Sequence, residues 1–169
     1  FIRDQYFLHD ENLAVSEVME FKYGGGSTLV DLTSIGVGRD PEALRRIALS
    51  TGLKIIMGSG WYTKNSYDEA VSKLSIQDLA DIIINDVTIG VGNSNIRSGI
   101  IGEIGVSDPM DPMELKVIKA AARASRVTGA SISLHWGGRN LEKHLTADTI
   151  KEEGAELSRT IFGHSDLIA

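Results

Sequence analysis

Residues 112–135 read PMELKVIKAAARASRVTGASISLH and contain one complete helix-to-strand unit. Pro112 suits the first turn of a helix, where its missing N–H has no partner to lose. Apolar residues and the alanine run 120–122 continue that helix to about residue 127. Gly129 then supplies the residue that commonly ends a helix. The stretch therefore predicts an α-helix, a sharp stop and a β-strand over 130–135 that ends on His135.

The same order of elements recurs along the chain. Helices are predicted at 12–23, 41–50, 76–87, 112–127 and 147–153. Strands are predicted at 28–33, 53–58, 99–104, 130–135 and 159–164. Strands that alternate with helices indicate parallel βαβ units. The strand segments are mostly apolar on both faces, which is typical of parallel strands that are covered by helices.

Two architectures fit this alternation, a closed parallel barrel and an open doubly wound sheet. An open sheet that binds a dinucleotide would carry a glycine-rich phosphate turn after its first strand. The segment Gly36-Val-Gly-Arg-Asp-Pro41 has two of the glycines and lacks the third. We therefore predict an α/β fold of the (β/α)₈ TIM-barrel type, with residues 1–169 forming one domain and the strands in sequential order.

Composition excludes several classes of function. The 169 residues include no cysteine, so disulfides, thiolate metal sites and a cysteine nucleophile are excluded. Acidic and basic residues are interleaved and the net charge is −6, so no nucleic acid and no membrane surface is expected as a partner. The apolar runs are too short to span a bilayer, and no signal-peptide pattern is present. A cytoplasmic protein is the expectation.

Three residues with metal-binding side chains fall at the ends of predicted strands. Glu103, His135 and His164 are separated by 32 and 29 residues, about one βα unit each. In a parallel barrel these strand ends open on one face, where active sites lie. A carboxylate and two imidazoles that converge there would suit zinc or a similar ion. The alternative is that the histidines are hydrogen-bonded core or rim residues, but a buried Glu103 would still need a partner.

Weaker candidates lie near the same face. Trp61 and Tyr62 follow the second predicted strand, and they either line a pocket or cover the rim of the barrel. Asp31 lies in a predicted strand and Asp166 follows one, so either could orient a ligand or a water molecule.

Several motifs together resemble one family. They are Gly25-Gly-Ser-Thr-Leu-Val-Asp-Leu-Thr33, Gly38-Arg-Asp-Pro41, Gly60-Trp-Tyr62, Gly99-Ile-Ile-Gly-Glu-Ile-Gly105, Ala120-Ala-Ala-Arg-Ala124, Ser131-Ile-Ser-Leu-His135 and Ile161-Phe-Gly-His-Ser-Asp166. In register over nearly the whole chain, they resemble the phosphotriesterase-related, lactonase-like proteins of the amidohydrolase superfamily. Such proteins are barrels with two divalent metal ions.

The resemblance implies roles for particular residues. Glu103 matches the carboxylate that bridges the two ions, and His135 and His164 match the ligands of the fifth and sixth strands. Tyr62 matches a pocket tyrosine of lactonase-like members, and Trp61 precedes it. The ions expected are zinc, with cobalt or manganese as alternatives. The implied activity is hydrolysis of a phosphotriester, lactone or carboxylic ester by a metal-bridging hydroxide, in a homodimer.

The sequence also departs from the family pattern. No His-x-His pair, which family members carry on their first strand, occurs in the chain. The predicted strands correspond to the second to the sixth of the barrel. We therefore expect the chain to be part of a longer barrel. A non-catalytic ligand-binding homologue with a vestigial metal site is the alternative function.

Overall fold

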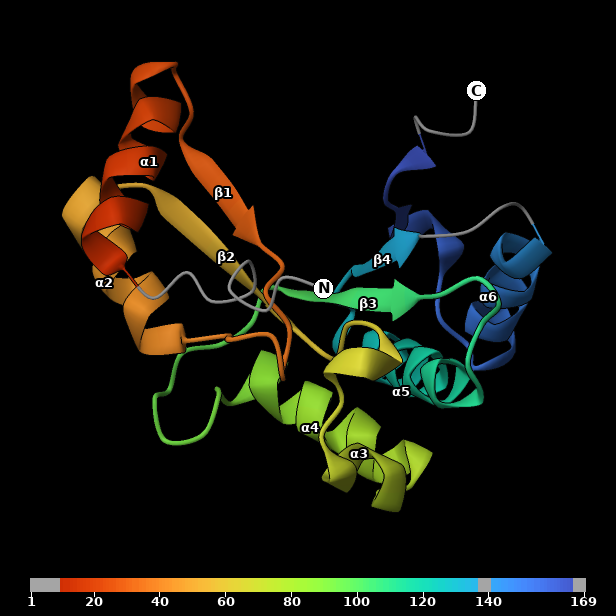
Figure 1. The fold of residues 1–169 in the computed structure, drawn as a ribbon. Helices are drawn as coiled ribbons and strands as arrows, with labels where there is room; N and C mark the ends of the chain where they lie inside the picture. Colours follow the sequence, from red (N-terminus) through yellow and green to blue (C-terminus); the bar gives the residue numbers. More distant parts are fainter. Residues whose placement is uncertain (1–9, 137–140, 166–169) are drawn as a thin grey trace.

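A parallel sheet curved into half a barrel runs through the computed structural model, which describes residues 10–136 and 141–165 (Figure 1). The strands are β1 (Thr28–Asp31), β2 (Lys54–Ser59), β3 (Ile100–Val106), β4 (Ile132–Trp136) and β5 (Thr160–Phe162). The helices are α1 (Glu11–Tyr23), α2 (Pro41–Thr51), α3 (Glu69–Lys73), α4 (Ile76–Thr88), α5 (Pro112–Thr128) and α6 (Leu141–Glu152), and the 3₁₀ turns are η2 (Lys64–Ser66) and η3 (Leu157–Arg159).

The strands of this sheet lie in the order β1-β2-β3-β4-β5, and every neighbouring pair is parallel. The predicted sequential order and the partial α/β barrel are therefore confirmed. The register is regular between β1 and β2 but shifts in β3, between Ile101 and Ile104. Glu103 lies in this irregular part of β3.

Local chemistry explains where the helices begin and end. The Asp40 side chain accepts a hydrogen bond from the N–H of Ala43 and so caps α2. Asp111 caps α5 in the same way, and Pro112 occupies the first turn of that helix. Gly129 ends α5 with a φ of 73°, a left-handed conformation that glycine adopts without strain. Of these residues, Pro112 and Gly129 occupy the roles that the sequence predicts for them.

The structure differs from the prediction in one additional helix and in the bounds of several elements. Helix α6 begins at Leu141 rather than at 147. The prediction missed its first turns because residues 141–146 are mostly polar and carry no clear apolar stripe. The five-residue helix α3 was not predicted, since it is too short for a helical period to be recognised. Strand β5 ends at Phe162, so His164 lies two residues beyond the strand, with a φ of 53°.

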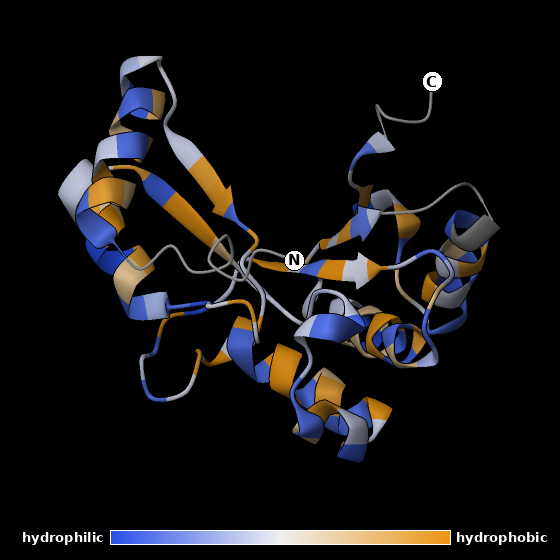
Figure 2. Ribbon diagram, viewed as in Figure 1, coloured by the Kyte–Doolittle hydropathy of each residue, from blue (hydrophilic) through white to orange (hydrophobic). Residues whose placement is uncertain are grey.

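The hydrophobic core lies between the sheet and its helices. Ile132 and Leu134 of β4 are 1% and 0% exposed and pack with buried residues of α4 and α5. Figure 2 shows apolar residues in the strands and in parts of α4 and α5. The opposite face of the sheet is more open: Val30 and Ile56 are register partners and remain 46% and 36% exposed. In the part of the chain that the structure describes, no helix has the length and apolarity needed to cross a membrane.

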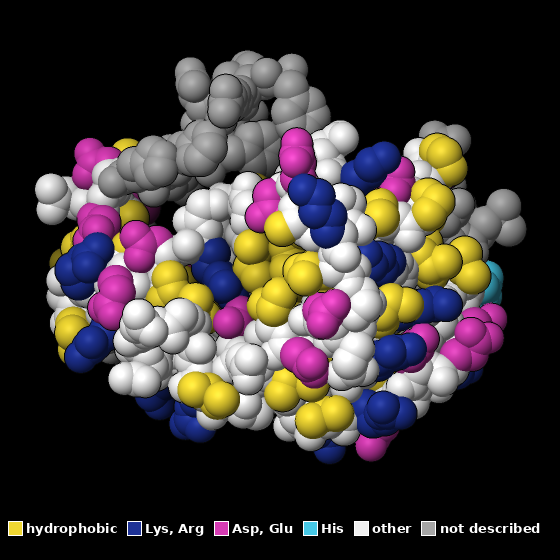
Figure 3. All heavy atoms as spheres, turned by 90° about the horizontal axis from the view of Figure 1, so that it is seen from below, with side chains coloured by type: hydrophobic (Ala, Val, Ile, Leu, Met, Phe, Trp, Pro, Cys, Tyr) yellow, Lys and Arg dark blue, Asp and Glu magenta, His cyan; other side chains and the backbone are white. Residues whose placement is uncertain are grey.

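The helical side of the molecule carries charges of both signs. Seen from below, acidic and basic side chains are interspersed, with apolar side chains between them (Figure 3). On this view no large region is of one sign.

A buried ion pair joins β2, α4 and the segment before α2. Arg39 Nη1 lies 2.7 Å from Asp86 Oδ2, and their side chains are 9% and 8% exposed. Ser59 Oγ also donates to Asp86 Oδ2, at 2.7 Å, and Arg39 Nη1 donates to the carbonyl oxygen of Gly58. Because both charges are buried, removal of one partner leaves the other without compensation.

We predict that Arg39→Met lowers the free energy of unfolding by about 3 kcal/mol, because Asp86 then stays buried without its cation. Urea denaturation measures the loss. The control is Arg45→Met, which breaks an exposed pair with Glu42 and should cost less than about 1 kcal/mol. Equal losses in the two variants would contradict the role of the buried pair.

Candidate metal centre

The backbone of β3 fixes Glu103 against the segment that follows β1. The N–H of Glu103 donates to the carbonyl oxygen of Leu32 at 3.1 Å, and the Glu103 carbonyl oxygen accepts from Ser34 Oγ at 2.7 Å. The Glu103 side chain is 24% exposed. Strand β3 extends to Val106, so Glu103 lies in the middle of the strand rather than near its end as the sequence predicted.

Two imidazoles converge on this carboxylate. Nδ1 of His135, from β4, lies 3.3 Å from Glu103 Oε2 and 3.2 Å from Nε2 of His164. The two imidazole rings meet edge to face, with centroids 4.7 Å apart. One ligand atom from each of the three residues can be chosen so that all lie within 4.8 Å of one another. The predicted convergence of these side chains is therefore present in the structure, whereas metal binding itself stays a prediction.

The spacing of the donor atoms fits a small divalent cation. Ligand atoms bound tetrahedrally to zinc at about 2.0–2.1 Å lie about 3.3 Å from one another. The separations from His135 Nδ1 to its two neighbours, 3.3 and 3.2 Å, match this value. No Lys or Arg of the described residues forms an ion pair with Glu103. One carboxylate and two imidazoles are also a ligand set that zinc and similar ions accept.

Tyr62 reaches His135 from the other side of its ring. Tyr62 Oη lies 2.8 Å from His135 Nε2, the nitrogen that points away from Glu103 and His164. The sequence prediction that Tyr62 faces the site agrees with this placement. Trp61 lies differently: it is 3% exposed and belongs to the hydrophobic core, so it offers almost no surface to a ligand. The physical reason is that its large apolar ring belongs to the same buried cluster as residues of β3, α4 and α5.

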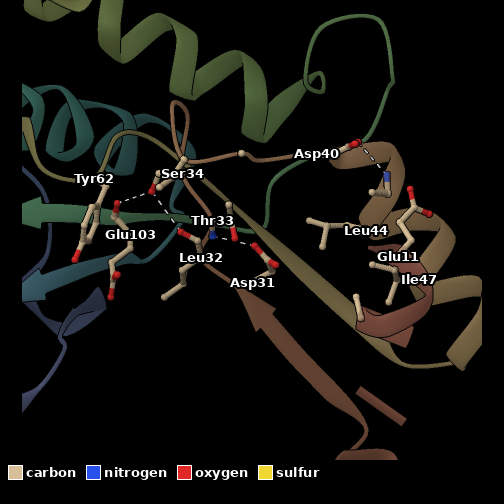
Figure 4. A pocket seen from close by; sticks show the side chains of 14 residues that line it. Glu11, Asp31, Leu32, Thr33, Ser34, Asp40, Leu44, Ile47, Tyr62 and Glu103 are labelled. Carbon is tan, nitrogen blue, oxygen red and sulfur yellow. Dashed lines mark hydrogen bonds between the residues drawn. The ribbon is translucent and has the colours of Figure 1, made fainter. Parts of the chain in front are cut away.

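A cavity of about 450 Å³ adjoins Glu103 and Tyr62. Its other walls come from residues 31–34 and from the facing sides of α1 and α2, as the close view in Figure 4 shows. Four acidic residues line it, Glu11, Asp31, Asp40 and Glu103, and no Lys or Arg of the described residues does, although Arg46, which is not part of the lining, pairs with Glu11. A cation or a neutral molecule would therefore be favoured over an anion in this cavity.

The sequence had suggested orienting roles for two aspartates. Asp31 lines the cavity and accepts a hydrogen bond from the N–H of Thr33 at 2.9 Å, so it shapes the segment that ends in Ser34. Asp166 lies outside the described residues. Ser34 was not predicted as a site residue, because only the fold brings its hydroxyl to the Glu103 carbonyl across 69 positions of sequence.

The family model for the Phosphotriesterase family matches residues 4–169. The chain belongs to this family. It is 38% identical over 161 residues to a phosphotriesterase-related protein of Nematostella vectensis, covering 94% of this chain and 46% of the relative. An N-acetyltaurine hydrolase of Dictyostelium discoideum is 36% identical over 159 residues, covering 94% and 43%.

Solved structures of the family have the same fold. A resiniferatoxin-binding protein from Rhodobacter sphaeroides superposes with a TM-score of 0.90 at 41% identity, covering 93% of this chain and 44% of that one. A lactonase from Listeria monocytogenes gives a TM-score of 0.87 at 25% identity, covering 95% and 54%. This phosphotriesterase-family chain spans about half the length of the relatives and structures it matches.

We predict that Gly163→Ala separates the two imidazoles of the site. A Cβ at position 163 would lie 2.8 Å from the carbonyl oxygen of Leu134, so the turn that carries His164 must move. Crystal structures of the variant and the parent measure the distance from His135 Nδ1 to His164 Nε2, which should increase.

Gly24→Ala is the matched control for this substitution. The backbone at Gly24 has a φ of −70°, and a Cβ there would meet its nearest atoms at 3.5 Å, an ordinary contact. The prediction fails if the distance between the imidazole nitrogens stays at its parent value in Gly163→Ala.

Proposed function

We propose that this chain supplies part of the active site of a metal-dependent hydrolase that acts on ester or lactone bonds. The observation that supports it most strongly is the convergence of Glu103, His135 and His164, whose donor atoms lie within 4.8 Å of one another, with the two separations from His135 Nδ1 close to those of ligands on one divalent ion. Membership of the phosphotriesterase family and the hydrolase relatives point the same way.

In this proposal each side chain has a distinct role. His135 and His164 would each hold an ion through one ring nitrogen, and Glu103 would hold it through its carboxylate. Divalent ions bound in such sites polarise a carbonyl or phosphoryl oxygen and make water a nucleophile near neutral pH. Tyr62 orients His135 through the opposite ring nitrogen. We expect two ions, with zinc favoured and cobalt or manganese as alternatives.

The acidic cavity narrows the class of substrate. Carboxylates on its walls repel an anionic substrate and leave neutral esters and lactones unopposed. A lactonase is among the relatives, so a carboxylic carbonyl is the favoured reacting group. Other relatives are hydrolases of N-acetyltaurine, an amide that also carries an anionic sulfonate, and these acidic walls would disfavour that substrate. A neutral phosphotriester fits the same electrostatic condition. The homodimer and the cytoplasmic location stay predictions.

A ligand-binding protein without catalysis is the second candidate. One observation favours it: a structure at 41% identity is described as a resiniferatoxin-binding protein. The two candidates differ in what the intact protein does with metal. A hydrolase turns over an ester only when metal is present, whereas a binding homologue retains a ligand without consuming it.

We predict that Glu103→Gln in the full-length protein lowers zinc affinity and the hydrolysis of a lactone or aryl ester together. Loss of the negative charge leaves only the imidazoles to hold each ion. Loss of a residue that merely supports a metal ligand lowers metal affinity about tenfold to a hundredfold, so loss of a ligand's charge should lower it by at least that factor. Elemental analysis gives the metal stoichiometry, and a colorimetric assay gives the rate.

The matched control is Glu42→Gln, which removes an exposed carboxylate of α2 that does not line the cavity. It should leave both metal content and rate unchanged. A Glu103→Gln protein that keeps its full metal content and rate would rule out the role given to this carboxylate.

We further predict that a chelator abolishes ester hydrolysis by the full-length protein and that zinc, cobalt or manganese restores it. Metal removal should also lower the melting temperature, because ligands on separate strands lose the ion that joins them. Calorimetry with and without chelator measures the second effect. Hydrolysis that survives complete metal removal would contradict the proposal, and metal binding without any turnover would favour the binding protein.

A further inference from the structure

The carboxylate of Glu114 is wholly buried, and the proposed mechanism does not use it. Glu114, in the first turn of α5, has an exposed fraction of 0%. Its Oε1 accepts from the backbone N–H of Lys64 at 3.0 Å and from Ser107 Oγ at 2.7 Å. Its Oε2 accepts from the backbone N–H of Ser107 at 2.8 Å. A buried carboxylate is costly unless it is hydrogen-bonded, and here it is bonded on both oxygens.

The donors belong to two different loops. Ser107 follows β3, and Lys64 begins the turn η2 in the loop that leaves β2. The same two loops are joined by the ion pair of Lys64 with Asp111, at 2.8 Å. Glu114 therefore ties the loop after β2 to the β3–α5 connection.

The loop after β2 carries Tyr62, two residues before Lys64. Its backbone also meets β3 directly, since the N–H of Gly105 donates to the carbonyl oxygen of Tyr62 at 3.2 Å. Tyr62 then contacts His135 Nε2 at 2.8 Å. A continuous series of contacts runs from Glu114 through Lys64 and Tyr62 to the imidazole of the metal centre.

We propose that Glu114 is a positioning residue for the metal centre: it fixes the loop that holds Tyr62 against His135. This inference rests on the proposed function, because it assigns His135 to a metal ion. Glu114 touches neither the ion nor the substrate. It acts by holding the Tyr62 hydroxyl at one nitrogen of His135, which leaves the other nitrogen directed at Glu103 and His164.

The carboxylate form is required for this role. Both oxygens of Glu114 face N–H or O–H donors, and a glutamine would place its own NH₂ group against one of them. Glu114→Gln can keep the bond to Lys64 or the bond to the Ser107 backbone, but not both. With the glutamine oxygen at the Oε2 position the loop at Lys64 is released, and with the oxygen at the Oε1 position the amide opposes the Ser107 N–H, so that only the Ser107 hydroxyl still holds that loop.

The test is a double-mutant cycle in the full-length protein, with zinc alone as the probe. Competition with a chromophoric chelator gives the zinc affinity. Tyr62→Phe and Glu114→Gln should each weaken binding by about tenfold. Because both substitutions act through the same contact, the double variant should bind zinc about as tightly as the weaker-binding single variant. Independent sites would instead give a loss of roughly a hundredfold.

A matched control separates positioning from general destabilisation. Ile118→Val shortens a buried side chain of the same helix, so it should lower the melting temperature and leave zinc affinity at the parent value. Ser107→Ala removes one of the three bonds and should weaken zinc binding by a smaller factor than Glu114→Gln. It also serves as the test variant if Glu114→Gln does not fold.

A second readout is the ¹⁵N resonance of His135 Nε2 in the metal-free protein. Glu114→Gln should move this resonance in the same direction as Tyr62→Phe does. If Glu114→Gln and Ser107→Ala leave both the affinity and the resonance at their parent values, the inference is overturned. If the loss of zinc affinity in the double variant equals the product of the two single losses, Glu114 does not act through Tyr62. If the parent protein takes up no zinc, the proposed function fails. The ¹⁵N resonance of His135 then tests by itself whether Glu114 positions Tyr62 against His135.

Discussion

Several segments must approach the backbone of β3 at the same place, and this close approach is the constraint on which the site depends. The segment after β1 accepts the Glu103 N–H through Leu32, and the loop after β2 accepts the Gly105 N–H through Tyr62. Strand β4 pairs along the same strand and brings His135 opposite Gly105. A side chain at Gly105 would collide with the backbone of Tyr62, so only glycine admits this arrangement. Glu103, Tyr62 and His135 are held together by contacts that all include β3.

The order of the strands was predictable because its signals are local. End signals such as Pro112 and Gly129 and the alternation of helix and strand can be read from neighbouring residues, and parallel units of this kind pair in sequence order. The donors Glu103 and His135 could be found because polar side chains stand out in apolar strands. His164 was predicted as a strand residue but lies in a turn, since nothing in Ile161-Phe-Gly-His164 marks where pairing ends.

Other features depend on contacts between distant segments and had no sequence signal. Trp61 and Tyr62 are neighbours on one loop, yet one ring enters the core and the other meets His135. Glu114 stands in the first turn of α5, where an acid commonly stabilises a helix and usually faces water. Its burial follows from the loops at Lys64 and Ser107, which cover it only in the folded chain.

The sequential strand order also has a consequence for synthesis on the ribosome. Each βα unit pairs with the one made just before it, so the sheet can grow from the N-terminus as the chain emerges. The donors are then added one at a time, Glu103 first, His135 next and His164 last. A nascent chain that ends before residue 164 carries only two of these three side chains, so the set of three is complete only after the turn that follows β5 has been made.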